Sequence, residues 1–138
     1  MEFSKEEIAT VYPKVSETLA DALGCEVADV KLDASLIDDL QAESIDFLDL
    51  VFRLERAFKV KIPRGKIVED ARGPLSEAEF EQKGVVTEAG VTRLKSFLSE
   101  VPPARFKTPL KSADIPRLFT PETFCKVVLR AQKAQAAA

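Results

Sequence analysis

LIDDLQAESIDFLDLVFRLERAF, residues 36–58, is the stretch that decides the fold of this 138-residue chain. It opens with an acidic turn between Leu36 and Leu40. After Ser44, apolar residues recur every three or four positions, which is typical of a helix with one buried face. Serine favours the N-cap of a helix because its hydroxyl accepts a backbone N–H. The sequence therefore predicts a helix from Ser44 to about Phe58.

The apolar residues of this predicted helix fall on two adjoining faces. One set is expected to face the core: Phe47, Leu50, Val51, Leu54 and Phe58. The other is expected at the mouth of an apolar cavity or on a partner surface: Ile45, Leu48 and Phe52.

These residues resemble the prosthetic-group region of acyl carrier proteins. In that family an acidic turn between two leucines precedes an Asp-Ser-Leu tripeptide, and the serine carries 4′-phosphopantetheine. Here the turn is Leu36 to Leu40, the tripeptide is Glu43-Ser44-Ile45, and Ile62-Pro63 resembles the connection beyond the second helix of the family. The resemblance covers about residues 13–67 and, more weakly, 117–130. It implies a carrier, and not an enzyme, that tethers acyl groups as thioesters on a covalent arm at Ser44.

Some residues depart from the family pattern. Glu43 replaces the usual aspartate, Ile45 replaces leucine, and Arg53 and Arg56 lie on a helix face that is commonly acidic or neutral. We interpret these departures as marks of a specialised carrier for a lipid or secondary-metabolite pathway, with dedicated enzymes. The resemblance implies as partners a phosphopantetheinyl transferase and the enzymes that load and transfer the acyl group. The predicted partner surface comprises Asp39, Glu43, Ile45, Asp46, Leu48, Asp49, Phe52, Arg53 and Arg56.

The segment before this region predicts a first helix. Ser4 and Glu7 form a capping box, and a helical apolar stripe follows as far as Leu23, with Gly24 as terminator. Pro13 removes one backbone donor, so we expect either a kink or a helix that starts near it. Residues 25–40 read as a long loop held by apolar side chains: Val27, Val30, Leu32, Leu36 and Leu40.

In the family a short third helix and a fourth helix follow almost at once, whereas here residues 68–116 intervene. A capping box at Ser76 predicts a helix from about Glu77 to Lys83. Val85-Val86 predicts a short extended piece, and Thr87 is the predicted cap of a further element. The prolines of residues 102–116 predict an extended connection. We expect the insertion to fold onto the carrier core near Phe52, because it is too apolar for a disordered segment.

Thr120-Pro121-Glu122 predicts the start of the last helix, displaced by the insertion. The expected fold class is therefore all-α: an acyl-carrier-like four-helix bundle with an additional, mostly helical insertion. The expected organisation is one domain over residues 1–138, with a core of 4–67 and 117–131 and an insertion at about 68–116.

Charge is unevenly distributed. Residues 1–58 carry 14 acidic and 5 basic residues, net −9, whereas residues 101–138 carry 2 acidic and 7 basic residues, net +5. The acidic half argues against binding of nucleic acid and favours basic partners. Two outcomes are open for Arg105, Lys107, Lys111 and Arg117: they cover part of the acidic surface and restrict which partners reach it, or they stay solvated and contribute little.

Composition excludes several classes of site. The chain has no histidine, which removes the usual zinc sites and histidine-based catalysis. Cys25 and Cys125 lie far apart and are expected to be free thiols in the cytoplasm. The N-terminus lacks the pattern of a signal peptide, and no apolar stretch is long enough to span a membrane. We expect a monomer without stable membrane insertion.

Three other interpretations remain open. An unmodified interaction module could keep the carrier fold, and an aminoacyl or peptidyl carrier uses the same attachment chemistry. A calcium sensor is suggested by the acidic residues from Asp33 to Asp49, but the spacing of calcium ligands fails at Ile37 and Asp38.

Overall fold

The structure is a computed structural model that describes residues 3–43, 46–62, 72–98, 101, 103–106 and 109–137. Within these ranges the chain is mostly helical, with one two-stranded sheet. The predictions for Ser44, Ile45 and Lys107 concern residues outside this description. The all-α prediction is confirmed.

Helix α1 spans Lys5–Leu23 and begins with the predicted capping box. The Ser4 hydroxyl accepts the Glu7 N–H at 3.1 Å, and the Glu7 carboxylate accepts the Ser4 N–H at 3.2 Å. Pro13 lies on the exposed side and one helix runs through it, so the predicted alternative of a helix starting near Pro13 is wrong. Gly24 ends the helix with φ of +69°, a conformation that glycine adopts without steric cost.

Helix α2 spans Asp46–Phe58 and buries Leu50, Val51 and Leu54 as predicted. The loop between α1 and α2 holds one short 3-10 turn, η1, at Val27–Asp29. Val30 and Leu36 are fully buried and fix this loop on the core. Val27 is 48% exposed, so its predicted role as an apolar anchor is wrong.

Helix α6 spans Pro121–Ala137 and takes the predicted place of the last helix. Its cap is a reciprocal pair of threonines: the Thr123 N–H donates to the Thr120 hydroxyl at 3.2 Å, and the Thr120 N–H donates to the Thr123 hydroxyl at 3.1 Å. The closing alanine-rich residues continue this helix as far as Ala137.

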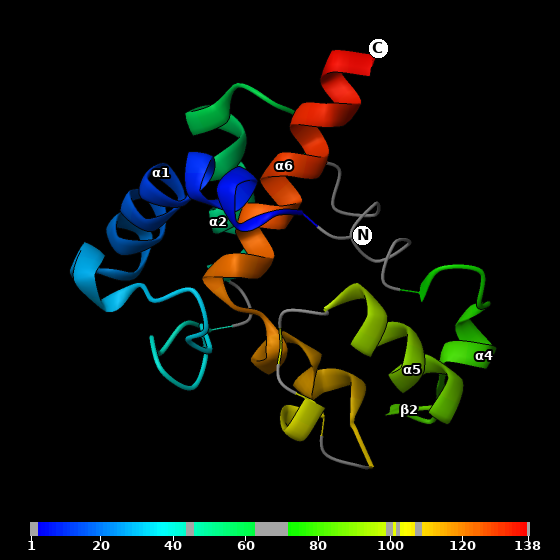
Figure 1. The fold of residues 1–138 in the computed structure, drawn as a ribbon. Coiled ribbons are helices and arrows are strands. Elements are labelled where there is room, and N and C mark those ends of the chain that lie inside the picture. Colours follow the sequence, from blue (N-terminus) through cyan, green and yellow to red (C-terminus); the bar gives the residue numbers. More distant parts are fainter. Residues whose placement is uncertain are drawn as a thin grey trace.

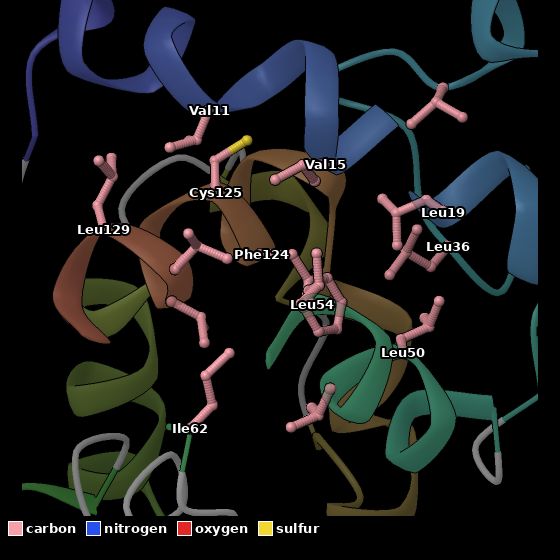
Figure 2. Packing of buried hydrophobic residues seen from close by; sticks show 14 of the residues in the cluster. Val11, Val15, Leu19, Leu36, Leu50, Leu54, Ile62, Phe124, Cys125 and Leu129 are labelled. Atoms are coloured by element: carbon pink, nitrogen blue, oxygen red, sulfur yellow. The ribbon is translucent and has the colours of Figure 1, made fainter. Parts of the chain in front are cut away.

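The carrier core lies where α6 and α2 pack against α1. Figure 2 shows Val15 and Leu19 of α1 facing Leu54 of α2 and Phe124 of α6. Leu36 from the loop enters the same cluster. The periodicity of residues 36–58 therefore predicts the buried face of α2 correctly.

In the described part of the insertion, helix α4 spans Glu77–Phe80, and strands β1, Glu81–Gln82, and β2, Val85–Val86, follow it. The predicted helix to Lys83 is wrong beyond Phe80. Lys83 and Gly84 both have positive φ, +54° and +79°, which gives the backbone twist that a two-residue antiparallel hairpin needs. The predicted extended piece at Val85-Val86 is confirmed.

Helix α5 spans Glu88–Phe97, with Thr87 at its N-cap as predicted. The Thr87 hydroxyl accepts the Gly90 N–H at 3.0 Å. A Cβ at position 90 would lie 2.4 Å from the carbonyl oxygen of Phe80, so glycine is required where α5 meets the end of α4.

The described part of residues 103–118 is more compact than predicted. They hold two 3-10 helices, η2 at Pro103–Arg105 and η3 at Ser112–Leu118. The Val86 N–H donates to the Leu110 carbonyl at 2.8 Å, and the Ser112 N–H donates to the Gly84 carbonyl at 3.0 Å. These bonds hold the segment against the hairpin, so the predicted extended connection is wrong.

The insertion has a hydrophobic cluster of its own. Phe80, Val86 and Leu94 pack with other buried side chains of the insertion, and Phe119 packs against both this cluster and the carrier core. Phe52 on α2 remains 46% exposed. The insertion gathers at the end of the bundle away from the C-terminus (Figure 1). The expected packing of its apolar residues around Phe52 is therefore wrong, because those residues cover one another.

The two cysteines are free and differ in burial. Burial raises the pKa of the Cys125 thiol to about 12. Burial and then the charge of Asp29 raise the pKa of Cys25, which is partly exposed. In the apo-protein at pH 8, a disulfide reagent is expected to modify Cys25 slowly and Cys125 only after unfolding in guanidinium.

The raised pKa of Cys125 also predicts that the stability of the folded protein depends on pH. An unfolded chain releases the Cys125 proton near its ordinary pKa of 9, whereas the folded protein keeps it to about 12. The contribution of Cys125 to stability is therefore complete below pH 9 and falls as pH rises toward 12. For the reactivity of the thiols, rapid modification of both cysteines in the folded protein at pH 8 would contradict the prediction.

Candidate functional site

The acidic turn before α2 is closed by hydrogen bonds around Ser35. The Asp39 carboxylate accepts the Ser35 N–H at 2.7 Å, and the Asp39 N–H donates to the Ser35 carbonyl at 2.9 Å. The Asp38 N–H donates to the Ser35 hydroxyl at 3.1 Å. Asp39 was predicted as a partner residue, and here its carboxylate also organises the turn.

The chain leaves this turn at the surface. Gln41 has φ of +60°, and the Ala42 N–H donates to the Leu36 carbonyl at 2.8 Å. Glu43 is exposed, and its N–H donates to the Asp46 carboxylate at 2.8 Å. The Asp46 carboxylate thereby accepts the backbone N–H of the residue three positions before it. The sequence analysis predicted Asp46 only as a partner residue and missed this structural role, although the three-residue spacing indicates it.

The outward face of α2 carries the other described residues of the predicted partner surface. Leu48 and Phe52 are 39% and 46% exposed. The Arg53 Nε lies 2.7 Å from the Asp49 carboxylate, and Arg56 is exposed. Glu43, Asp46 and Asp49 lie toward the N-terminal end of this face and the two arginines toward the C-terminal end. Acidic and basic groups at these ends also complement the helix dipole.

The acidic turn is bonded to the segment that leads into α6. The Ser35 hydroxyl donates to the Arg117 carbonyl at 2.9 Å, and the Leu36 N–H donates to the Phe119 carbonyl at 3.1 Å. The Arg117 Nη1 lies 2.8 Å from the Asp38 carboxylate. The expectation that Arg117 covers part of the acidic surface is confirmed.

The other basic residues of that expectation behave differently. Lys111 is exposed, and Arg105 is half-buried without an ion pair to any described residue. Within the described ranges, the structure brings no group of three or more metal-binding side chains together. In that part of the chain no helix is both long enough and apolar enough to cross a bilayer.

Comparison with known proteins places this turn and α2 in a family. The family model described as the phosphopantetheine attachment site matches residues 13–72. The acyl carrier protein of Clostridium acetobutylicum is 40% identical over 53 residues, which are 38% of this chain and 69% of that protein. The chain belongs to the acyl carrier protein family.

Two further acyl carrier proteins are similar to part of this chain. The acyl carrier protein of Bdellovibrio bacteriovorus is 42% identical over 53 residues, 38% of this chain and 68% of that protein. Acyl carrier protein AcpXL of Mesorhizobium japonicum is 34% identical over 59 residues, 43% of this chain and 63% of that protein. No solved structure gave a significant match. Acyl carrier proteins are carriers and not enzymes, and they work with transferases and acyl-handling enzymes.

The cofactor of this carrier is 4′-phosphopantetheine, bound covalently. The described residues around the attachment region fit that group. The exposed Glu43 leaves room for an attached chain beside it, and the start of α2 is a favourable place for a phosphate anion. When attached, the cofactor supplies a flexible arm and the thiol that holds the acyl group.

Proposed function

We propose that this protein carries acyl intermediates as thioesters on a 4′-phosphopantetheine arm attached to Ser44. The main support for this assignment is that the other serines of the matched region are buried. Ser16 is 2% exposed, and Ser35 is 5% exposed with its hydroxyl bonded to the Arg117 carbonyl and the Asp38 N–H. Neither hydroxyl is accessible to a loading enzyme. Ser44 follows the exposed Glu43 and holds the family position.

The neighbouring residues have separate roles in this proposal. The first backbone N–H groups of α2 and its dipole stabilise the phosphodiester anion. The Asp46 carboxylate accepts the Glu43 N–H and so fixes the backbone that leads into α2. The exposed Glu43 carboxylate is available to a basic surface of the transferase.

The test is loading in vitro. Incubation of the apo-protein with coenzyme A and a broad-range phosphopantetheinyl transferase is expected to add about 340 Da, the mass of the arm, as suits a group carrier. Ser44→Ala is expected to gain nothing, and Ser96→Ala, at an exposed serine of α5, is the control that keeps the gain. A mass gain in Ser44→Ala would overturn the assignment.

We further propose a specialised lipid or secondary-metabolite pathway with dedicated loading and transfer enzymes. The support is the charge on α2: Arg56 is exposed, and Arg53 remains 39% exposed although it pairs with Asp49. An aminoacyl or peptidyl cargo remains the second candidate. We also propose that the protein is a monomer with one domain, in which residues 4–67 and 117–131 form the core and residues 68–116 form the insertion. We propose a reducing cytoplasm as its location, because both cysteines are free thiols.

Enzymes of general fatty-acid synthesis are expected to use this carrier poorly. Where a partner presents basic residues, like charges at the interface can cost several kcal/mol. Reversing both arginines, Arg53→Glu with Arg56→Glu, is therefore expected to raise the elongation rate with a general ketoacyl synthase. The control is Lys83→Glu with Lys95→Glu, which changes net charge equally at exposed positions of the insertion. An unchanged or lower rate in the arginine variant would count against dedicated partners.

A further inference from the structure

Two hollows lie between the carrier loop and the insertion, and they meet at Arg105. The first, of about 590 Å³, is lined by Asp38 and Asp39 from the loop and by Arg105, Leu110 and Leu118 from the insertion side. The second, of about 540 Å³, is lined by Cys25, Leu40 and Gln41 together with the same Asp39 and Arg105. We name the two hollows together the junction groove.

Arg105 is a cation of this groove with one buried nitrogen, Nη1, that lacks a hydrogen-bond partner among the described residues. Arg117, by contrast, is paired with Asp38 at 2.8 Å and Asp114 at 3.5 Å. A buried guanidinium nitrogen without a partner costs free energy, so such a group calls for an acceptor.

The groove begins close to the attachment position. Gln41 precedes Ser44 by three residues, so their Cα atoms lie at most about 11 Å apart. The 4′-phosphopantetheine arm is about as long as four or five extended residues, ~15 Å. An arm fixed at Ser44 is therefore longer than the largest possible distance from Ser44 to Gln41, and Gln41 lines the same hollow as Arg105.

The lining matches the chemistry of that arm. The arm alternates short apolar stretches with two amide groups and ends in a thiol. Arg105 offers N–H donors to an amide carbonyl, the Asp38 and Asp39 carboxylates are acceptors for amide N–H groups, and Leu110 and Leu118 offer apolar contact. A site with convergent polar groups on an apolar wall is typical of ligand binding.

We propose that the junction groove binds the pantetheine portion of the arm, with Arg105 donating to one of its amide carbonyls, and so shelters the thioester between carrier loop and insertion. This inference rests on the proposed attachment at Ser44. It assigns the insertion a function: the insertion supplies Arg105 and Leu110, and Leu118, just after the insertion, completes the same wall of the groove. The alternative is a hydrated groove whose charges only hold the two units together.

The test is isotope-filtered NMR on protein labelled with ¹³C and ¹⁵N and loaded with an unlabelled arm from coenzyme A. Nuclear Overhauser effects are expected from arm protons to the methyl groups of Leu110 and Leu118, with a shift of the Arg105 Nε–H resonance between apo and loaded protein. Arg105→Gln is expected to lose these effects. Lys95→Gln, an exposed cation on α5 outside the groove, is expected to keep them.

The outcomes separate the two proposals. A mass gain on loading without contacts at Leu110 and Leu118 would overturn the groove proposal and leave the carrier function intact. Absence of any mass gain would overturn the attachment at Ser44 and the groove proposal with it. If Arg105→Gln fails to fold, the contacts in the unaltered loaded protein decide alone.

Discussion

Leu54→Ala is expected to destabilise the carrier core by about 2–5 kcal/mol. Leu54 is fully buried at the centre of α2, where it meets side chains of α1 and α6 (Figure 2). Truncation removes buried apolar area and leaves a cavity, because three packed helices cannot close around it completely. Urea unfolding followed by circular dichroism measures the loss.

The matched control for Leu54→Ala is Leu48→Ala on the same helix. Leu48 is 39% exposed, so the same chemical change there is expected to cost less than about 0.5 kcal/mol. Equal losses in the two variants would contradict the assignment of the buried face of α2.

Leu98→Ala is expected to unfold the insertion while the carrier core remains folded. Leu98 is fully buried in the insertion cluster, which shares Phe119 with the carrier core. A loss of about 2–5 kcal/mol falls mainly on the small insertion cluster. Hydrogen exchange is expected to show lost protection in α5 and retained protection in α1, α2 and α6.

Lys95→Ala is the control for Leu98→Ala, since Lys95 is exposed on α5 and its loss leaves the cluster intact. If Leu98→Ala lowers the protection of α1 as much as that of α5, the insertion and the core form one cooperative unit, and the separation into two packing units is wrong.

The carrier core was largely predictable from the sequence because its information is local. The capping box at Ser4, Gly24 after α1 and Pro121 at the start of α6 mark helix ends within a few residues of themselves. The helical spacing of Leu50 and Leu54 selects the buried face of α2 in the same way.

The insertion was less predictable because its structure depends on contacts between distant residues. The capping box at Ser76 predicts a longer helix than α4, but the hydrogen bonds of Val86 to Leu110 and of Ser112 to Gly84 hold residues 81–86 as a hairpin. Apolar periodicity shows that side chains such as Phe80 need a surface to cover. It does not show whether that surface is α2 or the rest of the insertion.

The candidate site was predictable in part. Helical spacing predicts the exposed stripe of Leu48 and Phe52, and the attachment at Ser44 stays a prediction of the family pattern. The uneven charge suggests that Arg117 meets the acidic half, but it does not select Asp38, which lies 79 positions away. Nor does it bring Arg105 to Asp39 in the junction groove. Such pairings arise only when the chain closes on itself.

The intact mass of the protein isolated from its native host tests the carrier function most directly. We expect one arm at Ser44, bearing an acyl group that hydroxylamine releases as expected for a thioester, and an unmodified mass for Ser44→Ala from the same host. An unmodified mass for the natural protein, under conditions in which another acyl carrier of that host bears its arm, would contradict the carrier function and favour an interaction module that keeps the carrier fold.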